Sequence, residues 1–244
     1  MLRGVVLTGV RKAKQQQDVS FLVGFETEVV FLEDGMFPPV PISNHAWSTS
    51  LSMRSSGVGK GIVEEVYDVL TDAGIEVQQF HAESAPGQYE IITGPLPPVE
   101  AVDALVFTRD TIYNVAAKHG ARATLYPKVY KDSCILLNRM RLIVGGTAAH
   151  VHVSLKRGTA SPDAKIEGVP GLKVLETEFI AGLMDHLQAV SALAMPTFAS
   201  YERLMDGAWA VISFSQGSDY RVELSFAGEW KIGSVPSTWL VTDR

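Results

Sequence analysis

The chain has 244 residues, 46% of them apolar and 20% charged, and its 27 acidic residues against 21 Lys and Arg give a formal net charge of -6. This composition fits one globular domain with a substantial core, and it excludes a disordered chain, a collagen-like repeat and a disulfide scaffold. The single cysteine, Cys134, has no second cysteine to pair with inside the chain. That indicates a reducing compartment.

Charge and hydropathy also argue against two classes of partner. A nucleic-acid platform needs a basic face to neutralise phosphates, and the sequence shows none. No apolar run approaches the roughly 20 residues that span a bilayer. The run Val5-Val6-Leu7 is too short for a secretory signal, and the basic stretch Arg11-Lys12-Lys14 lies on the wrong side of it. We therefore expect a cytoplasmic protein without nucleic-acid or membrane partners.

The first half of the chain alternates strand-like and helix-like segments. Residues 21–32 form an apolar, strand-like run, and the Pro- and Ser-rich stretch 37–56 predicts a long surface loop. Apolar residues at steps of three and four predict a helix over residues 58–73, ending before Gly74. Strands are expected next, at residues 75–80 and 88–93.

The second half continues this mixed order. A helix is predicted over residues 99–119, with Gly120 beyond it, and strands over 122–125 and 149–156. A third helix carries an apolar stripe from Leu175 to Leu187 and ends before Pro196. The alternation predicts an α+β fold, a sheet or incomplete barrel with helices packed on its outer face.

The strand at residues 21–32 contains two acids, Glu26 and Glu28, in otherwise apolar surroundings. Side chains two apart in a strand point the same way, so both carboxylates share one face. That face is either solvated, as in many antiparallel sheets, or a cation site, because an isolated buried carboxylate is very costly. The segment alone leaves both interpretations open.

Two further segments carry chemistry. In Glu83-Ser-Ala-Pro-Gly-Gln-Tyr-Glu90 a Pro-Gly turn separates two acids, and on its own an exposed turn explains it best. The strand at 149–156 places His150, His152 and Ser154 on one face. Imidazoles in this arrangement serve as structural residues, as metal ligands or as contacts to phosphate oxygens, and the segment alone leaves these roles open. Together, acids and imidazoles on separate strands suggest Mg²⁺ or Mn²⁺, with imidazole favouring Mn²⁺. The lone cysteine lies outside this set, which argues against zinc.

Four motifs occur in the order found in the catalytic domain of glutamine synthetase. They are Glu26-Thr-Glu28, the segment from Glu83 to Glu90, Gly146-Thr-Ala-Ala-His-Val-His-Val-Ser-Leu155 and Ala199-Ser-Tyr-Glu-Arg-Leu204. The chain thus resembles the glutamine-synthetase-like superfamily from about Phe21 to Trp209. The resemblance implies an incomplete catalytic barrel, a mostly antiparallel curved sheet with helices on its outer face.

The resemblance also implies two sites for divalent cations. One would be held by Glu28, Glu83 and Glu90, and the other, beside the ATP phosphates, by Glu26 and His150.

The remaining implied contacts concern the substrates. His152 and Ser154 fall where the family contacts the nucleotide, Gly146 where its backbone meets glutamate, and Arg203 where an arginine pairs with the substrate carboxylate. No catalytic acid or base is assigned.

By resemblance, the activity is ATP- and divalent-metal-dependent ligation of glutamate, or a related amino acid, with ammonia or an amine through a γ-glutamyl phosphate. The family also implies a homo-oligomeric ring. Gly145 replaces an asparagine of the family motif, which favours γ-glutamyl-polyamine or other γ-glutamyl-amide ligases.

The sequence departs from the family at both ends. We expect an N-terminal extension over residues 1–20, a catalytic domain over 21–209 and a divergent tail over 210–244, in a truncated family member. These departures motivate an alternative, a non-catalytic fragment or pseudoenzyme with a structural or regulatory role. A guanidino kinase, which has a related fold, is disfavoured by the His-x-His-x-Ser and Pro-Gly-Gln motifs.

Overall fold

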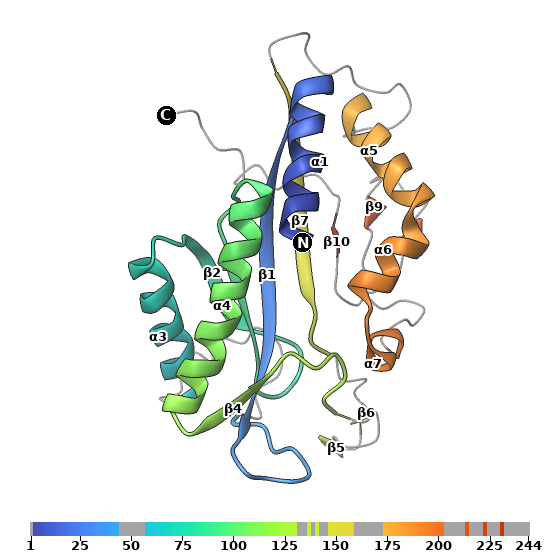
Figure 1. Cartoon of the computed structure of the whole chain (residues 1–244). Coiled ribbons are helices and arrows are strands. Elements are labelled where there is room, and N and C mark those ends of the chain that lie inside the picture. The colour runs from blue at the N-terminus through green and yellow to red at the C-terminus, as the bar shows by residue number, and fades with distance from the viewer. Residues whose placement is uncertain are drawn as a thin grey trace.

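The computed structural model describes residues 2–43, 57–130, 146–158 and 173–202, and the backbone of five two-residue strands. The helices are α1 (Leu2–Gln17), α3 (Val58–Asp72), α4 (Pro98–Lys118), α5 (Val174–Asp185), α6 (Leu187–Ala194) and α7 (Phe198–Tyr201) (Figure 1). The longer strands are β1 (Val19–Glu33), β2 (Val77–Ala82), β3 (Gln88–Thr93), β4 (Ala121–Thr124) and β7 (Ala149–Arg157). The short strands are β5 (Leu136–Leu137), β6 (Met140–Arg141), β8 (Ser213–Phe214), β9 (Val222–Glu223) and β10 (Trp230–Lys231). Within this part of the chain, no helix is both long and apolar enough to cross a bilayer.

The main sheet is built around β1, the long strand at the centre of Figure 1. Its order is β10-β7-β1-β3-β2, and β4 also pairs with β1. Every pair is antiparallel except β10 with β7. The structure therefore confirms the predicted α+β class and the mostly antiparallel sheet with helices packed against it.

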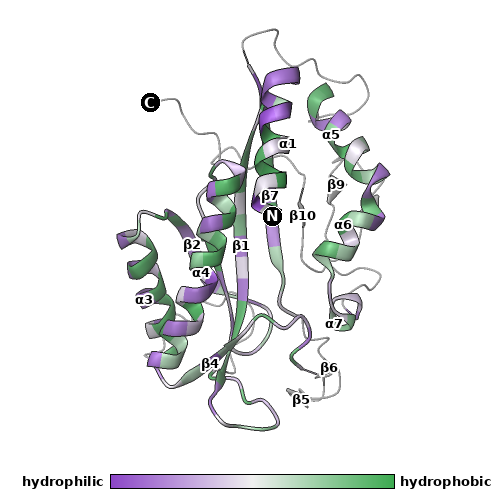
Figure 2. Cartoon of the chain, in the orientation of Figure 1, coloured by the Kyte–Doolittle hydropathy of each residue, from purple (hydrophilic) through white to green (hydrophobic). Residues whose placement is uncertain are grey.

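Helices α3 and α4 cover one face of this sheet and form the main core with it. Ile62 and Val66 of α3 and Ile112 of α4 pack against alternate residues of β1, among them Val29 and Phe31. All five side chains are fully buried. Figure 2 shows that β1 is most hydrophobic in its lower half, beside α3 and α4, and that these two helices carry both apolar and polar residues. Burying their apolar sides against the sheet fixes which face of β1 points away from the helices.

The predicted helices over residues 58–73 and 99–119 and all five predicted strands are confirmed, with ends that differ by one or two residues. Of the predicted loop over residues 37–56, residues 37–43 lie in the described part of the chain. Residues 44–56 lie outside it.

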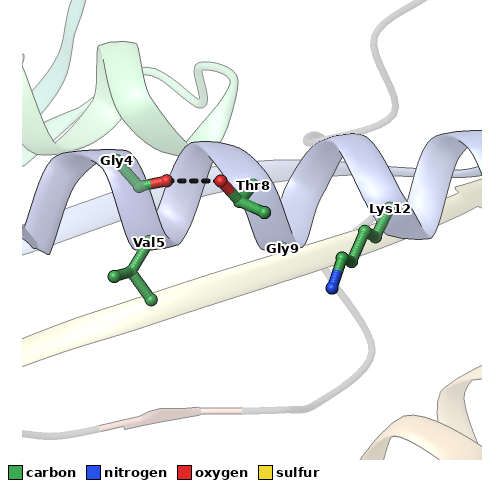
Figure 3. A pocket seen from close by; sticks show the side chains of 5 residues that line it. All are labelled: Gly4, Val5, Thr8, Gly9 and Lys12. Atoms are coloured by element: carbon green, nitrogen blue, oxygen red, sulfur yellow. Dashed lines mark hydrogen bonds between the residues drawn. The ribbon is translucent and has the colours of Figure 1, made fainter.

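Helix α1 was not among the predicted elements. It lies against β1 and α4, and Leu7, Val10 and Ala13 are its only half-buried residues among those described. Gly4 and Gly9 leave its backbone uncovered on another side, beside Val5, Thr8 and Lys12, where a shallow hollow runs along the helix (Figure 3). None of the predicted site residues lines that hollow. The two glycines weaken the helical signal in the sequence.

The third predicted helix is divided in two at His186, between α5 and α6. The amide of His186 donates to the carbonyl of Leu183 at 3.2 Å instead of to Gly182. The His186 ring nitrogen Nδ1 contacts the Gly182 carbonyl at 2.8 Å in its place. A side chain thus takes the acceptor that a continuous helix would use.

Candidate functional site

Three strands bring acids and imidazoles together on the face of the sheet opposite α3 and α4. In the β1–β7 pairing Glu26 lies opposite His150, and in the β1–β3 pairing Glu28 lies opposite Glu90. Directly paired residues of antiparallel strands share a face, so all four side chains converge. The sequence predicted that the two acids of β1 share a face. The strand pairing also identifies the residue opposite each acid, His150 for Glu26 and Glu90 for Glu28.

His150 lies at the centre of this group. Its ring atom Nδ1 is 2.7 Å from Glu26 Oε2, 3.7 Å from Glu90 Oε2 and 3.9 Å from Glu28 Oε1. The side chains of His150, Glu28 and Glu90 are at most 10% exposed, and that of Glu26 is 14% exposed. The second imidazole of β7, His152, places Nε2 2.6 Å from Glu26 Oε1. Three carboxylates therefore surround one buried imidazole nitrogen.

A second group adjoins the first and shares Glu90 with it. His81, at the end of β2, lies opposite Glu90 in the β2–β3 pairing. Its Nε2 is 3.1 Å from Glu90 Oε1, and its Nδ1 is 3.7 Å from Glu83 Oε1. Glu83 is in turn fixed by the Ser84 amide, which donates to Glu83 Oε2 at 2.9 Å. Glu90 is thus the link between the two groups.

The pKa values of Glu26 and Glu90 are lowered, and that of Glu83 is raised. Burial alone would raise the pKa of Glu26, but hydrogen bonds with His150 and His152 outweigh it and lower the pKa well below the ordinary range. Burial likewise opposes ionisation of Glu90, and contacts with His150 and His81 lower its pKa overall. Burial and the charge of Glu90 together raise the pKa of Glu83. The site therefore holds closely spaced negative charge.

These residues fit a divalent cation. Two sets each place one ligand atom per residue within 4.8 Å of one another: Glu26, Glu90 and His150, and His81, Glu83 and Glu90. The donors are carboxylate oxygens and imidazole nitrogens, which suit Mn²⁺ and, where oxygen dominates, Mg²⁺. Burial first, and repulsion by the charge of Glu90 second, raise the pKa of Glu83, so both disfavour its ionised form. A bound cation would relieve that repulsion.

The remaining predicted residues lie at the edges of the site or beyond the described residues. Gly146 is buried beside Glu28, and its carbonyl accepts a hydrogen bond from Gln88 Nε2 at 3.2 Å. Ser154 is exposed, on the same sheet face as His152 but two residues further along β7. Arg203 lies outside the described residues, as does Gly145.

Two residues of the site were missing from the sequence prediction. His81 was missed because the strand was expected to end at Phe80, although its spacing of two from Glu83 was a usable signal. Gln88 was predicted only as the first residue of the strand over residues 88–93, with no role in the site. Its partners come from β1 and from the segment before β7, and local sequence does not reveal such long-range neighbours.

The fold and the site together define a sheet that presents a carboxylate- and imidazole-rich cation site. The catalytic domain of glutamine synthetase matches residues 3–223, a range wider than the motif-bearing stretch 21–209. The chain belongs to this family.

Individual relatives agree with this assignment. Protein fluG of Emericella nidulans is 36% identical over 235 residues, covering 92% of this chain and 24% of that protein. Gamma-glutamylpolyamine synthetase GlnA3 of Streptomyces coelicolor is 34% identical over 152 residues, 62% of this chain and 30% of the relative. The cryo-EM structure of Plasmodium falciparum glutamine synthetase has the same fold, with a TM-score of 0.69 at 18% identity, over 88% of this chain and 46% of that chain. The chain thus spans about a quarter to a third of these two curated relatives.

Proposed function

We propose that this domain catalyses, or contributes to, the ATP- and divalent-metal-dependent ligation of glutamate or a related amino acid with ammonia or an amine. The observation that carries the proposal is the position of His150 Nδ1, within 3.9 Å of carboxylates from two different strands, Glu26 and Glu28 of β1 and Glu90 of β3. Family membership supports a ligase-type activity.

The proposed reaction has two steps. A γ-carboxylate oxygen of glutamate attacks the terminal phosphorus of ATP, and ADP leaves. The nitrogen of ammonia or an amine then attacks the resulting γ-glutamyl phosphate, phosphate leaves, and the nitrogen loses a proton. In the first step an anion approaches a polyanion, so cationic groups must offset the charge that gathers there.

In this proposal each residue has a binding role. Glu28, Glu83 and Glu90 hold one Mg²⁺ or Mn²⁺, and Glu26 and His150 hold a second. Bound divalent cations would neutralise phosphate oxygens, which bare carboxylates would repel.

The nucleotide and amino-acid contacts are proposed for residues at the rim. His152 and Ser154, which follow His150 on the same face of β7, are proposed to contact ATP. The backbone of Gly146 is proposed to meet glutamate, and Arg203 to pair with its carboxylate, since a guanidinium offers a planar pair of donors. We further propose a cytoplasmic protein that assembles as a homo-oligomeric ring.

The test supplies ATP, glutamate, Mn²⁺ and hydroxylamine, which stands in for the amine, and measures ADP and γ-glutamyl hydroxamate. We expect both products from the wild-type chain and neither from Glu28→Ala. Glu33→Ala is the matched control, because Glu33 is an exposed acid at the end of the same strand. ATP binding with neither product would reject the ligase and favour a binding protein that retains the fold.

A further inference from the structure

Gln88 is a fully buried glutamine, 1% exposed, at the start of β3. Its carboxamide touches three separate parts of the chain. Nε2 donates to Glu28 Oε2 at 2.6 Å and to the carbonyl of Gly146 at 3.2 Å. Oε1 accepts from the Ala85 amide at 2.9 Å. One side chain therefore joins β1, the turn that follows Glu83, and the segment that leads into β7.

The contacts fix the orientation of this amide. A flip about the side-chain axis would turn its oxygen toward the two oxygens of Glu28 and Gly146, and its NH₂ group toward the Ala85 N–H. Both changes would replace hydrogen bonds with repulsion. Gln88 therefore presents its donors to Glu28 in a single arrangement.

The same arrangement orients Glu28. Its Oε2 also accepts the Ala148 amide at 2.8 Å, so two N–H donors hold that oxygen. Its other oxygen, Oε1, is turned toward His150 and the centre of the site, at 3.9 Å from Nδ1. Outer partners of this kind orient metal ligands, and their loss typically lowers metal affinity about 10–100-fold.

We propose that Gln88 is a positioning residue of the cation site: it holds Glu28 so that Oε1 alone faces the cation, and it ties this carboxylate to the segment from Gly146 to Ala148. The proposal rests on the proposed function, because that function supplies the cation. Gln88 itself touches neither cation nor substrate.

The experiment is a double-mutant cycle on Mn²⁺ affinity, measured by electron paramagnetic resonance of unbound Mn²⁺. Gln88→Met keeps the length of the side chain and removes its hydrogen bonds. We expect it to weaken the same Mn²⁺ binding step that Glu28→Gln weakens, by about 10–100-fold. In the Glu28→Gln background it should add little, because its effect passes through Glu28. Gln79→Met, at an exposed glutamine of the neighbouring strand, is the control.

The outcomes separate this inference from the proposed function. If wild type binds no Mn²⁺, the proposed function fails, and the inference fails with it. If wild type binds and Gln88→Met binds equally well, or loses as much affinity in the Glu28→Gln background, only the positioning role is rejected.

A measurement on the wild-type chain covers the case in which Gln88→Met does not fold. In a Mg²⁺ titration followed by NMR, the side-chain NH₂ of Gln88 and the amide of Ala148 should shift together, because both donate to Glu28 Oε2. Unchanged signals at saturating Mg²⁺ would overturn the proposal.

Discussion

Glu90 is a proposed metal ligand and is shared by the two groups of ligand atoms that the structure brings together, one with Glu26 and His150 and one with His81 and Glu83. Neutralising it should therefore weaken metal binding. Glu90→Gln preserves the shape of the side chain and removes its charge. Without metal the substitution also removes one of several neighbouring negative charges, since Glu90 contributes to the raised pKa of Glu83. It also removes the charge that faces His81 and His150, so we expect the metal-free variant to fold but to unfold at a lower temperature than wild type. The response of each protein to Mn²⁺ is therefore measured from its own metal-free midpoint.

The size of the effect follows from ligand linkage. Mn²⁺ at about 100 times its Kd stabilises a one-site protein by about 2.7 kcal/mol. For a chain of 244 residues each kcal/mol raises the midpoint by about 2–4 °C, which gives about 5–11 °C for wild type. A 100-fold loss of affinity leaves about 0.4 kcal/mol at the same Mn²⁺ concentration, or about 1 °C.

The assay is thermal unfolding with Mn²⁺ and, in parallel, with a chelator. Glu33→Gln serves as control, because it removes an exposed charge from the end of β1 and should keep the full wild-type response. If Glu90→Gln gives the same Mn²⁺-dependent shift as wild type, Glu90 is not a ligand, and the shared-ligand arrangement is wrong.

Two further predictions concern the fold around the site. Gly87 has φ +68°, and a Cβ there would lie 2.6 Å from the Phe31 carbonyl oxygen; Gly74 has φ +80° and open space around it. In urea titrations Gly87→Ala should therefore cost about 1–3 kcal/mol more than Gly74→Ala, and equal costs would contradict the clash. The hydrogen bond with Glu90 raises the pKa of His81 from 6.5 to about 9. His81 thus stabilises the metal-free fold below pH 6.5 and loses this effect as pH rises through about 9, so thermal midpoints in chelator should fall over that window in wild type but not in His81→Asn.

The local part of the site was predictable because it depends only on strand alternation. Residues two apart share a face whatever the neighbouring strands are, so the convergence of Glu26 and Glu28, and of His150 and His152, follows from sequence. Which strands lie beside β1 depends on pairings between residues 58 to 138 positions apart. The resemblance to a known family supplied that information, and alternation could not.

The elements and residues that the sequence did not predict also have local causes. The predicted strand ended two residues before β2 does, which left His81 out of the strand and the second candidate group out of the prediction. The break at His186 depends on a side chain that competes for a backbone carbonyl, and an apolar stripe does not report such competition. Helix α1 was missed because two glycines lower its propensity, and its contact with β1 supplies the stability that propensity lacks.

The core and the site depend on the same register of β1. Val29 and Phe31 point into the core beneath α3 and α4, while Glu28 and Val30 point to the other face. A slip of one residue would move the carboxylates into that core and the apolar side chains out of it, at a cost of several kcal/mol for each buried charge. The packing of α3 and α4 on β1 therefore excludes the alternative register. The geometry of the acidic group is thus set by apolar residues that never touch a ligand.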